Sequence, residues 1–134
     1  MYQKLIIIGN LGRDPEMRFT PDGNPVTSFT VATSRKYKDT DETTWFRISA
    51  WGKLAEACNQ YLRKGSRVFV EGRLIPDLQT GGPKVYQKND GSWGSNFDVY
   101  AKTVRFLTPK SEFSGESSGG SDFMDDAMED DIPF

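Results

Sequence analysis

The 134-residue sequence contains no histidine and only one cysteine, Cys58. The absence of histidine excludes general acid–base catalysis by histidine and metal ligation by histidine. One cysteine cannot form a disulfide within the chain or a cysteine-type zinc site. The one dense apolar run, residues 5–8, is far too short for a signal peptide or a membrane span. We therefore expect a soluble, cytoplasmic protein in which Cys58 is a small buried side chain on a helix.

Other catalytic patterns are also missing. No glycine-rich loop has the spacing of a phosphate-binding loop, and Gly9 and Gly12 are too sparse for a dinucleotide fingerprint. The acidic cluster of Asp39, Asp41 and Glu42 lacks the central glycine of a calcium-binding loop, and loop carboxylates are usually solvated. The sequence thus predicts no catalytic residue, no metal site and no cofactor, and enzyme is the least favoured class of function.

Basic residues are absent from the C-terminal segment, so the net charge of −2 hides two unequal parts. Residues 1–110 hold all 17 Lys and Arg and 11 of the 19 acids, whereas residues 111–134 hold the other eight acids. The second segment is rich in Ser, Gly, Asp and Glu and cannot bury enough apolar surface to offset the entropy of ordering. We predict a folded basic domain over residues 1–110 and a disordered acidic tail over residues 111–134. This asymmetry points to nucleic acid, but a solubilising tail remains an equal alternative.

Strand patterns, turns and one helix fill the predicted domain. Apolar alternation and β-branched residues predict strands at residues 3–12, 26–37, 44–51, 66–74 and 97–107. A loop is expected after residue 12, a turn at residues 21–24, a polar loop at residues 38–43 and a hairpin-like excursion between residues 81 and 91. Four residues at helical spacing predict a helix over residues 53–63, ended by Gly65: Leu54, Cys58, Tyr61 and Leu62. This order predicts an all-β, five-stranded Greek-key OB-fold barrel with the helix between strands three and four.

The strand at residues 44–51 carries two different faces. Alternation places one set of side chains together, Trp45, Arg47, Ser49 and Trp51, and the other set opposite, Phe46, Ile48 and Ala50. The second set is an ordinary core face. The first set suits a single strand of nucleic acid, because each base can stack on an aromatic ring for roughly 1–3 kcal/mol and arginine adds charge. The alternative is that both tryptophans pack in a subunit interface or under a loop.

Two further segments mix basic and aromatic residues. They are Arg35, Lys36, Tyr37 and Lys38 at the end of the second predicted strand, and Lys84, Tyr86, Lys88 and Trp93 in the excursion. Strand packing would be the commoner role for either tyrosine alone. Three such clusters in one domain favour binding of a flexible strand, in which cations meet phosphates and rings meet bases.

Several stretches carry a family resemblance. They are residues 9–16 (GNLGRDPE), 45–47 (WFR), 52–56 (GKLAE), 61–66 (YLRKGS) and 70–72 (VEG), with the C-terminal DDIPF at 130–134. In this order they resemble the bacterial single-stranded DNA-binding proteins from about residue 2 to residue 109, and again over the last five residues. The resemblance implies a homotetramer of OB-folds around which single-stranded DNA wraps without catalysis, in the bacterial cytoplasm at the nucleoid.

The resemblance also implies roles for individual residues. The base-stacking aromatics of the family map onto Tyr37, Trp45 and Trp51. The positions associated with strand contacts map onto Arg47, Lys53, Arg63 and Lys64. The family's acidic tip maps onto Asp130, Asp131, Ile132, Pro133 and Phe134, which are implied to dock into replication, recombination and repair enzymes.

Two features depart from the family pattern. Residues 75–78 read IPDL where the family has basic residues and an aromatic, so Tyr86 or Trp93 is expected to replace that stacking residue. The tail is also short, about 24 residues. Two alternatives to non-specific binding of single-stranded DNA are recognition of structured RNA or a specific oligonucleotide, and a protein-interaction scaffold that works through its tail. The clusters show no surplus of Asn or Gln to read base edges, which favours non-specific binding.

Overall fold

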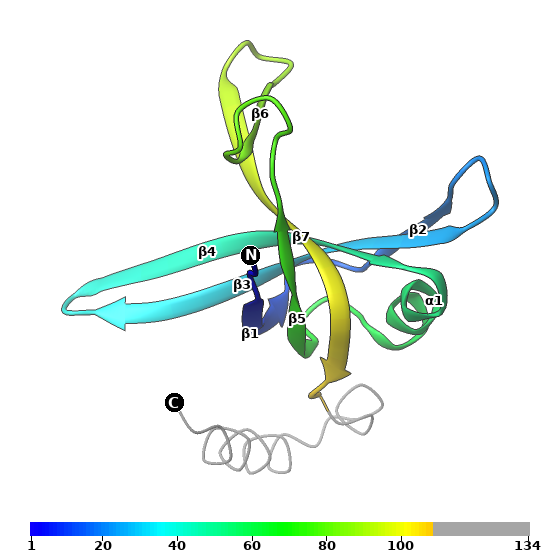
Figure 1. Cartoon of the computed structure of the whole chain (residues 1–134). Helices are drawn as coiled ribbons and strands as arrows, with labels where there is room; N and C mark the ends of the chain where they lie inside the picture. Colours follow the sequence, from blue (N-terminus) through cyan, green and yellow to red (C-terminus); the bar gives the residue numbers. More distant parts are fainter. Residues whose placement is uncertain (109–134) are drawn as a thin grey trace.

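The computed structural model of the chain describes residues 1–108, which form strands and a single helix (Figure 1). In chain order the elements are β1 (Leu5–Leu11), β2 (Glu16–Phe19), β3 (Pro25–Tyr37), β4 (Thr40–Trp51), α1 (Gly52–Tyr61), β5 (Arg67–Ile75), β6 (Lys84–Gln87) and β7 (Trp93–Phe106). The predicted acidic tail and its tip lie outside the described residues. The helix found in residues 1–108 is neither long nor apolar enough to cross a membrane.

Five of the strands close into a barrel. They follow the order β1-β5-β7-β4-β3, and β1 then pairs with β3 where Asn10 lies opposite Ala32. All of these pairings are antiparallel except that of β4 with β7. Strand β2 extends the sheet beyond β3, and β6 pairs with the first part of β7. The predicted five-stranded OB-fold barrel, with one helix between its third and fourth strands, is confirmed.

The core of the barrel comes from alternate residues of its strands. Each barrel strand contributes at least one β-branched side chain that is at most 2% exposed: Ile7, Val31, Ile48, Val70 and Val99. Closure of the barrel also needs a residue without a side chain. A Cβ atom added to Gly9 of β1 would collide with the backbone carbonyl oxygen of Ala32 on β3. Glycine at this position therefore lets the first and third strands come together.

Helix α1 packs against β3 and β4 and places Ala55 and Cys58 in the core. The hydroxyl group of Thr27, buried on β3, donates a hydrogen bond to the carbonyl oxygen of Ala55 at 2.6 Å and ties the helix to the barrel. Burial raises the pKa of the Cys58 thiol to about 12, so this side chain stays protonated at neutral pH. The prediction of a buried Cys58 is confirmed.

The predicted end of the helix is wrong by two residues. The helix stops at Tyr61, and Leu62 already has an extended backbone. Gly65 does adopt the left-handed conformation, with φ of 89°, but it belongs to a tight turn in which the N–H of Ser66 donates to the carbonyl of Arg63. Tyr61 is exposed instead of lying in the core, and its ring packs on that of Phe106 at 5.7 Å. Helical spacing alone did not reveal that the chain turns away after Tyr61.

Two strand segments were not predicted. Residues 16–19, which follow the predicted loop through Asp14 and Pro15, form β2 and pair with β3. Residues 38–43, expected as a loop, contain only a two-residue turn, Lys38-Asp39, because Tyr37 already pairs with Thr40. Lys38 has a positive φ of 57°, as such a turn requires. Residues 38–43 are polar on both faces and lack the apolar alternation by which a strand is predicted. In β2 Met17 and Phe19 do alternate with Glu16 and Arg18, but over four residues only.

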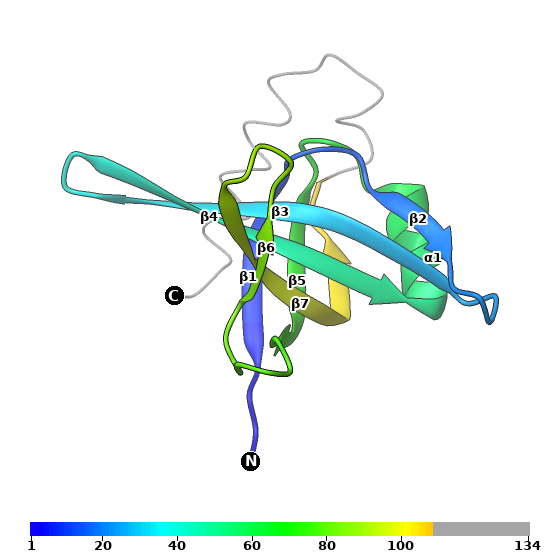
Figure 2. The ribbon, with the colours of Figure 1, turned by 90° about the horizontal axis from the view of Figure 1, so that it is seen from above.

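Two long hairpins project beyond the barrel in different directions (Figures 1 and 2). One joins the outer parts of β3 and β4. The other joins β6 to β7 and confirms the predicted excursion, although β7 starts at Trp93 and not at residue 97. Each hairpin presents one of the mixed basic and aromatic clusters found in the sequence.

Candidate nucleic-acid interface

Strand β4 presents Trp45, Arg47 and Trp51 on its outward face, as its alternation predicts. Trp45 is 54% exposed and Trp51 is 42% exposed, whereas Ile48 and Ala50 between them are fully buried. Phe46, the third residue of the predicted core face, is partly buried and packs at the edge of the core. Within residues 1–108 no loop buries either tryptophan, since each ring keeps about half of its surface exposed. The other part of the alternative interpretation, in which a second copy of the chain covers the two tryptophans, is tested by replacing each of them with alanine.

A groove of about 370 Å³, here called the aromatic groove, runs along this face. Trp45 and Arg47 line it with side chains from four other regions, the β1–β2 connection, β2, β3 and the β6–β7 hairpin. Its other lining residues are Arg13, Asp14, Glu16, Arg18, Ser28, Phe29, Thr30, Phe46, Tyr86 and Asn96. The groove therefore joins two of the clusters found in the sequence, the face of β4 and Tyr86 of the excursion.

Arg13 and Arg18 are groove residues that the sequence did not single out. Arg13 follows β1, inside the stretch that carries the family resemblance. Arg18 lies on β2 opposite Val26 of β3, which in turn lies opposite Trp51 of β4, so the three form one row across the sheet. Since β2 was not predicted, this alignment of a cation with Trp51 could not be inferred. The alternation of residues 16–19 would have been the signal.

The guanidinium group of Arg47 is available to a ligand. It is exposed and takes part in no ion pair or hydrogen bond within residues 1–108. Asp14 in the same groove is already used, because its Oδ1 accepts a hydrogen bond of 2.8 Å from the backbone N–H of Lys64. This bond holds the turn after α1, with Arg63 and Lys64, beside the groove. Lys53 is exposed in the first turn of α1, two residues after Trp51.

The β3–β4 hairpin carries the predicted cluster around Tyr37. The ring of Tyr37 is exposed, and the charged groups of Arg35 and Lys38 lie over it at 5.8 and 5.4 Å from its centre. Pairing of the strands places Tyr37 on the same side of the hairpin as Phe46, whereas Lys36 shares the side of Trp45. Tyr37 therefore does not lie on the same face as Trp45 and Arg47.

The negative charges of this hairpin do not form a metal site. Glu42 pairs with Arg35 at 3.4 Å, and Asp41 lies opposite Lys36. Among residues 1–108 no three His, Cys, Asp or Glu side chains gather closely enough to hold a metal ion. The acids instead offset part of the positive charge of the hairpin.

The β6–β7 hairpin divides the cluster that the sequence placed together. Lys84 lies opposite Asn96, and Tyr86 lies opposite Gly94, so both point to the side of the aromatic groove. Trp93 lies opposite Gln87 on the other side of the hairpin and is 65% exposed. Lys88 begins the turn, where its N–H donates to the carbonyl of Ser92. Of the two candidates for the missing stacking residue of the family, Tyr86 lines the groove and Trp93 does not.

The segment that departs from the family pattern has a structural role. Oδ1 of Asp77 accepts hydrogen bonds from the backbone N–H groups of Gln79 and Thr80, and this arranges the connection after β5. Leu78 is almost fully exposed and lies at none of the hollows described here. An aromatic base platform is therefore absent from residues 75–78.

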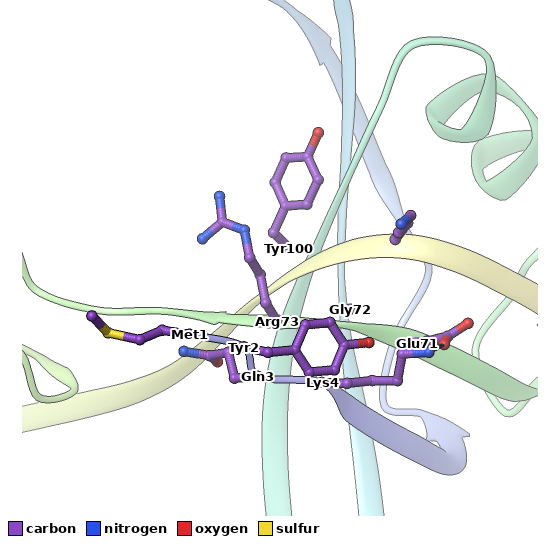
Figure 3. Close-up of a pocket in the computed structure, with 9 residues that line it drawn as sticks. Met1, Tyr2, Gln3, Lys4, Glu71, Gly72, Arg73 and Tyr100 are labelled. Atoms are coloured by element: carbon purple, nitrogen blue, oxygen red, sulfur yellow. Dashed lines mark ion pairs between the residues drawn. The ribbon is translucent and has the colours of Figure 1, made fainter.

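A second hollow, of about 610 Å³, lies between residues 1–4 and the outer surface of β5 and β7 (Figure 3). Lys4 and Glu71 form an ion pair there, which raises the pKa of Lys4 and lowers that of Glu71. Figure 3 shows Arg73 and Tyr100 extending to the same side, with the guanidinium 5.1 Å from the ring centre. Tyr100 pairs with Ser49 of β4, so the outer surface continues from Trp51 to this hollow. Its charged groups are largely engaged with one another, unlike Arg47.

The barrel and the aromatic groove together define an OB-fold domain with a surface of the kind that takes up oligonucleotides. The chain matches the model of the single-strand binding protein family over residues 2–107, and it belongs to that family. Proteins of this family are non-enzymatic, in agreement with the sequence-based prediction. The match ends one residue before the last described residue, so it covers the barrel and both hairpins.

Two relatives place the chain within this family. It is 36% identical over 159 aligned positions to single-stranded DNA-binding protein 1 of Chlorobaculum tepidum, covering 98% of this chain and 96% of the relative. It is 39% identical over 117 positions to the single-stranded DNA-binding protein of Neisseria meningitidis, covering 84% of this chain and 63% of the relative. The match therefore spans less than two thirds of the Neisseria protein, but almost the whole of the Chlorobaculum protein.

Proposed function

We propose that this protein binds single-stranded DNA without sequence specificity. The observation that carries the proposal is the aromatic groove, in which exposed Trp45 and Tyr86 lie beside the guanidinium of Arg47, which has no partner among residues 1–108. Both relatives named above are single-stranded DNA-binding proteins, which supports the same ligand. Bases stack on the rings, and phosphates contact Arg13, Arg18 and Arg47.

The chemistry of the groove favours a single strand over a duplex. A base offers its flat face to a ring only when it is not stacked in a helix, and each such stack contributes roughly 1–3 kcal/mol. Cations that follow the groove serve any sequence, because phosphates carry no base identity. Asn96 is the single amide side chain among the lining residues, so there is little to read a base edge. Recognition of one particular sequence, in DNA or RNA, is therefore disfavoured.

The remaining candidate residues extend the DNA path outward from the groove. Trp51 lies further along β4, in one row with Arg18, and Lys53 follows it at the start of α1. The other candidates are carried by the turn after α1 and by the two hairpins: Arg63, Lys64, Arg35, Lys36, Tyr37, Lys38, Lys84, Lys88 and Trp93. Contact of a strand with both hairpins requires it to leave the face of β4, because Tyr37 and Trp93 lie on other sides.

We also propose that four copies assemble into a homotetramer around which the DNA wraps. The support is the family resemblance, together with exposed apolar residues away from the groove. Tyr2 and Ile6, at the N-terminal strand, are more than half exposed, and a neighbouring copy would cover them. Sedimentation equilibrium tests this assembly: a species of four chains is expected, and a monomer at micromolar concentration would contradict it.

The acidic tail is proposed to recruit enzymes of replication, recombination and repair in the bacterial cytoplasm. Its tip combines Asp130 and Asp131 with the apolar Ile132, Pro133 and Phe134, which suits a basic, apolar pocket on a partner. Deletion of Phe134 should abolish recovery of such an enzyme in a pull-down while DNA affinity stays unchanged. Equal recovery with and without Phe134 would reduce the tail to a solubility segment.

One titration tests the main proposal. Tryptophan fluorescence is followed while oligo(dT), oligo(dA) or a duplex of the same length is added. We expect quenching and tight binding with both single strands and much weaker binding of the duplex. Strong preference for one short sequence, or equal affinity for the duplex, would contradict non-specific binding of single strands.

A further inference from the structure

Two aromatic rings of the groove lie directly on glycine residues. A Cβ atom added to Gly12 would come within 2.6 Å of Cζ3 and 2.9 Å of Cη2 of the Trp45 indole. A Cβ atom added to Gly94 would come within 2.9 Å of Cζ and 3.0 Å of the hydroxyl oxygen of Tyr86, and within 3.0 Å of Cε of the flexible Lys88 side chain. Such distances are shorter than real Cβ contacts, so each ring occupies the space that any side chain at the glycine would need.

The backbone does not explain these two glycines. The left-handed conformation, which favours glycine, occurs at Gly23, Gly52, Gly65, Gly81 and Gly91, but neither at Gly12 nor at Gly94. Gly94 lies in regular pairing opposite Tyr86, and the N–H of Gly12 donates to the carbonyl oxygen of Thr30 at 3.1 Å. An L-residue could adopt either backbone. What distinguishes these positions is the ring above them.

Other glycines of the barrel serve a different purpose. Added Cβ atoms at Gly9 and Gly72 would collide with the backbone carbonyl groups of Ala32 and Tyr100 on neighbouring strands. Substitution there must separate two strands. At Gly12 and Gly94 the colliding atoms belong to exposed side chains that can swing away into solvent. A substitution at Gly12 or Gly94 therefore displaces the ring and leaves the barrel intact.

We propose that Gly12 and Gly94 are positioning residues that let the outer ends of the Trp45 and Tyr86 rings rest against the backbone, and so hold the rings in place for the DNA. This inference rests on the proposed function and deepens it. Trp45 and Tyr86 are each about half exposed, as rings that are only partly covered should be. A ring held in this way has already lost its rotational freedom, so a base that stacks on it orders less of the protein.

The test begins with Gly12→Ala and with Gly82→Ala as the matched control, because a Cβ at Gly82 meets nothing closer than 3.8 Å. Gly12→Ala should lower the affinity for oligo(dT) by about 3- to 10-fold, a fraction of the contribution of one stacked base. The thermal unfolding midpoint should equal that of the control. An oligonucleotide of abasic sites, which offers phosphates without bases, should bind the variant and the parent protein equally.

A second variant, Trp45→Phe, separates the effect of the indole ring from other effects of the glycine substitution. Phenylalanine at position 45 lacks the two atoms that would collide, so Gly12→Ala should cost no further affinity in a Trp45→Phe protein. The same logic applies to Gly94→Ala in the parent protein and in a Tyr86→Leu background. Near-ultraviolet circular dichroism of a protein whose only tryptophan is Trp45 should change on Gly12→Ala, since the indole leaves its fixed position.

The outcomes are distinguishable. Equal losses with and without the Trp45 indole, or an equal loss with abasic DNA, would overturn the inference and make Gly12 a point where the DNA backbone approaches closely. A lower unfolding midpoint for both Gly12→Ala and Gly94→Ala would overturn it in favour of a purely structural role. If the parent protein failed to bind oligo(dT), the proposed function would fail instead.

Discussion

Successive side chains of β4 point to opposite faces of the strand, and the two faces differ in solvent exposure. Its inward residues Ile48 and Ala50 are fully buried in the barrel, whereas the large rings of Trp45 and Trp51 are exposed to solvent. Burial of the inward face stabilises the fold. The outward face contributes little to stability and leaves apolar surface exposed, which favours binding of a partner. One strand thus separates folding from binding by alternation alone. Substitutions on the two faces should have separable effects.

The largest effect is expected from the inward face. Ile48→Ala removes a fully buried side chain, so the free energy of unfolding should fall by about 2–5 kcal/mol. Urea unfolding followed by circular dichroism measures this change, with Ile48→Val as the milder control at about 0.5–1.5 kcal/mol. The DNA affinity of the protein that remains folded should be unchanged. A loss of affinity without a loss of stability would contradict the separation.

The outward face should behave in the opposite way. Trp45→Ala and Trp51→Ala should each weaken binding of poly(dT) by roughly 1–3 kcal/mol, since each removes a stacking ring. The unfolding midpoint should hardly move, because both rings are exposed. Trp45→Phe, which keeps a smaller ring, should lose less. If both alanine variants bound like the parent protein, the face would be a subunit interface and the central proposal would fail.

Arg47 sharpens the comparison because it lies between the two tryptophans on the same face. Arg47→Ala should reduce the dependence of affinity on salt by about 0.7 in the slope of log K against log[salt], the value for one phosphate contact on a single strand. Arg47→Lys keeps the charge and should restore the slope, but not the affinity that the planar guanidinium adds by stacking. Titrations at several salt concentrations measure both quantities. An unchanged slope for Arg47→Ala would place the phosphate elsewhere.

The two faces of β4 could be predicted from the sequence because every second side chain of a strand lies on the same face, either in the core or in solvent. Residues 16–19 alternate as well, but a run of four residues with no buried side chain at the edge of a sheet is too short a signal to predict a strand. Without β2, the place of Arg18 in one row with Trp51 could not be foreseen. The groove also depends on tertiary closure, which brings Arg13, Trp45 and Tyr86 together from distant parts of the chain. Local patterns contain no information about such approaches.

The division between Tyr86 and Trp93 has a more particular cause. Their sides depend on the register of the β6–β7 hairpin, in which Gln87 lies opposite Trp93. A shift of one residue would place Tyr86 opposite Trp93, with both rings on one face. The connection of residues 88–92 sets this register through its geometry, which composition does not reveal. The sequence therefore predicted the cluster but not its division.

The smallest expected effects on DNA affinity come from Tyr86 and Trp93, which lie on opposite sides of the β6–β7 hairpin. Tyr86→Ala should weaken binding of an oligonucleotide that fills one groove by about 1 kcal/mol, the lower end for a stacked base. Trp93→Ala should change the same affinity by less than about 0.5 kcal/mol, as is usual for a surface substitution away from the binding site. Fluorescence titration of both variants under identical salt conditions compares them directly.

A protein with one tryptophan at a time makes the comparison independent of affinity. With Trp45 and Trp51 replaced by phenylalanine, the emission reports Trp93 alone, and a short oligo(dT) should leave it unquenched because the ring faces away from the groove. The matched protein that keeps only Trp45 should be quenched by the same DNA. If a longer oligonucleotide then quenched Trp93, the strand would have passed around the hairpin to its other face, as wrapping requires. Quenching of Trp93 by the short oligonucleotide would instead mean that the DNA reaches both faces at once, and the separation of Tyr86 from Trp93 would have no consequence for binding.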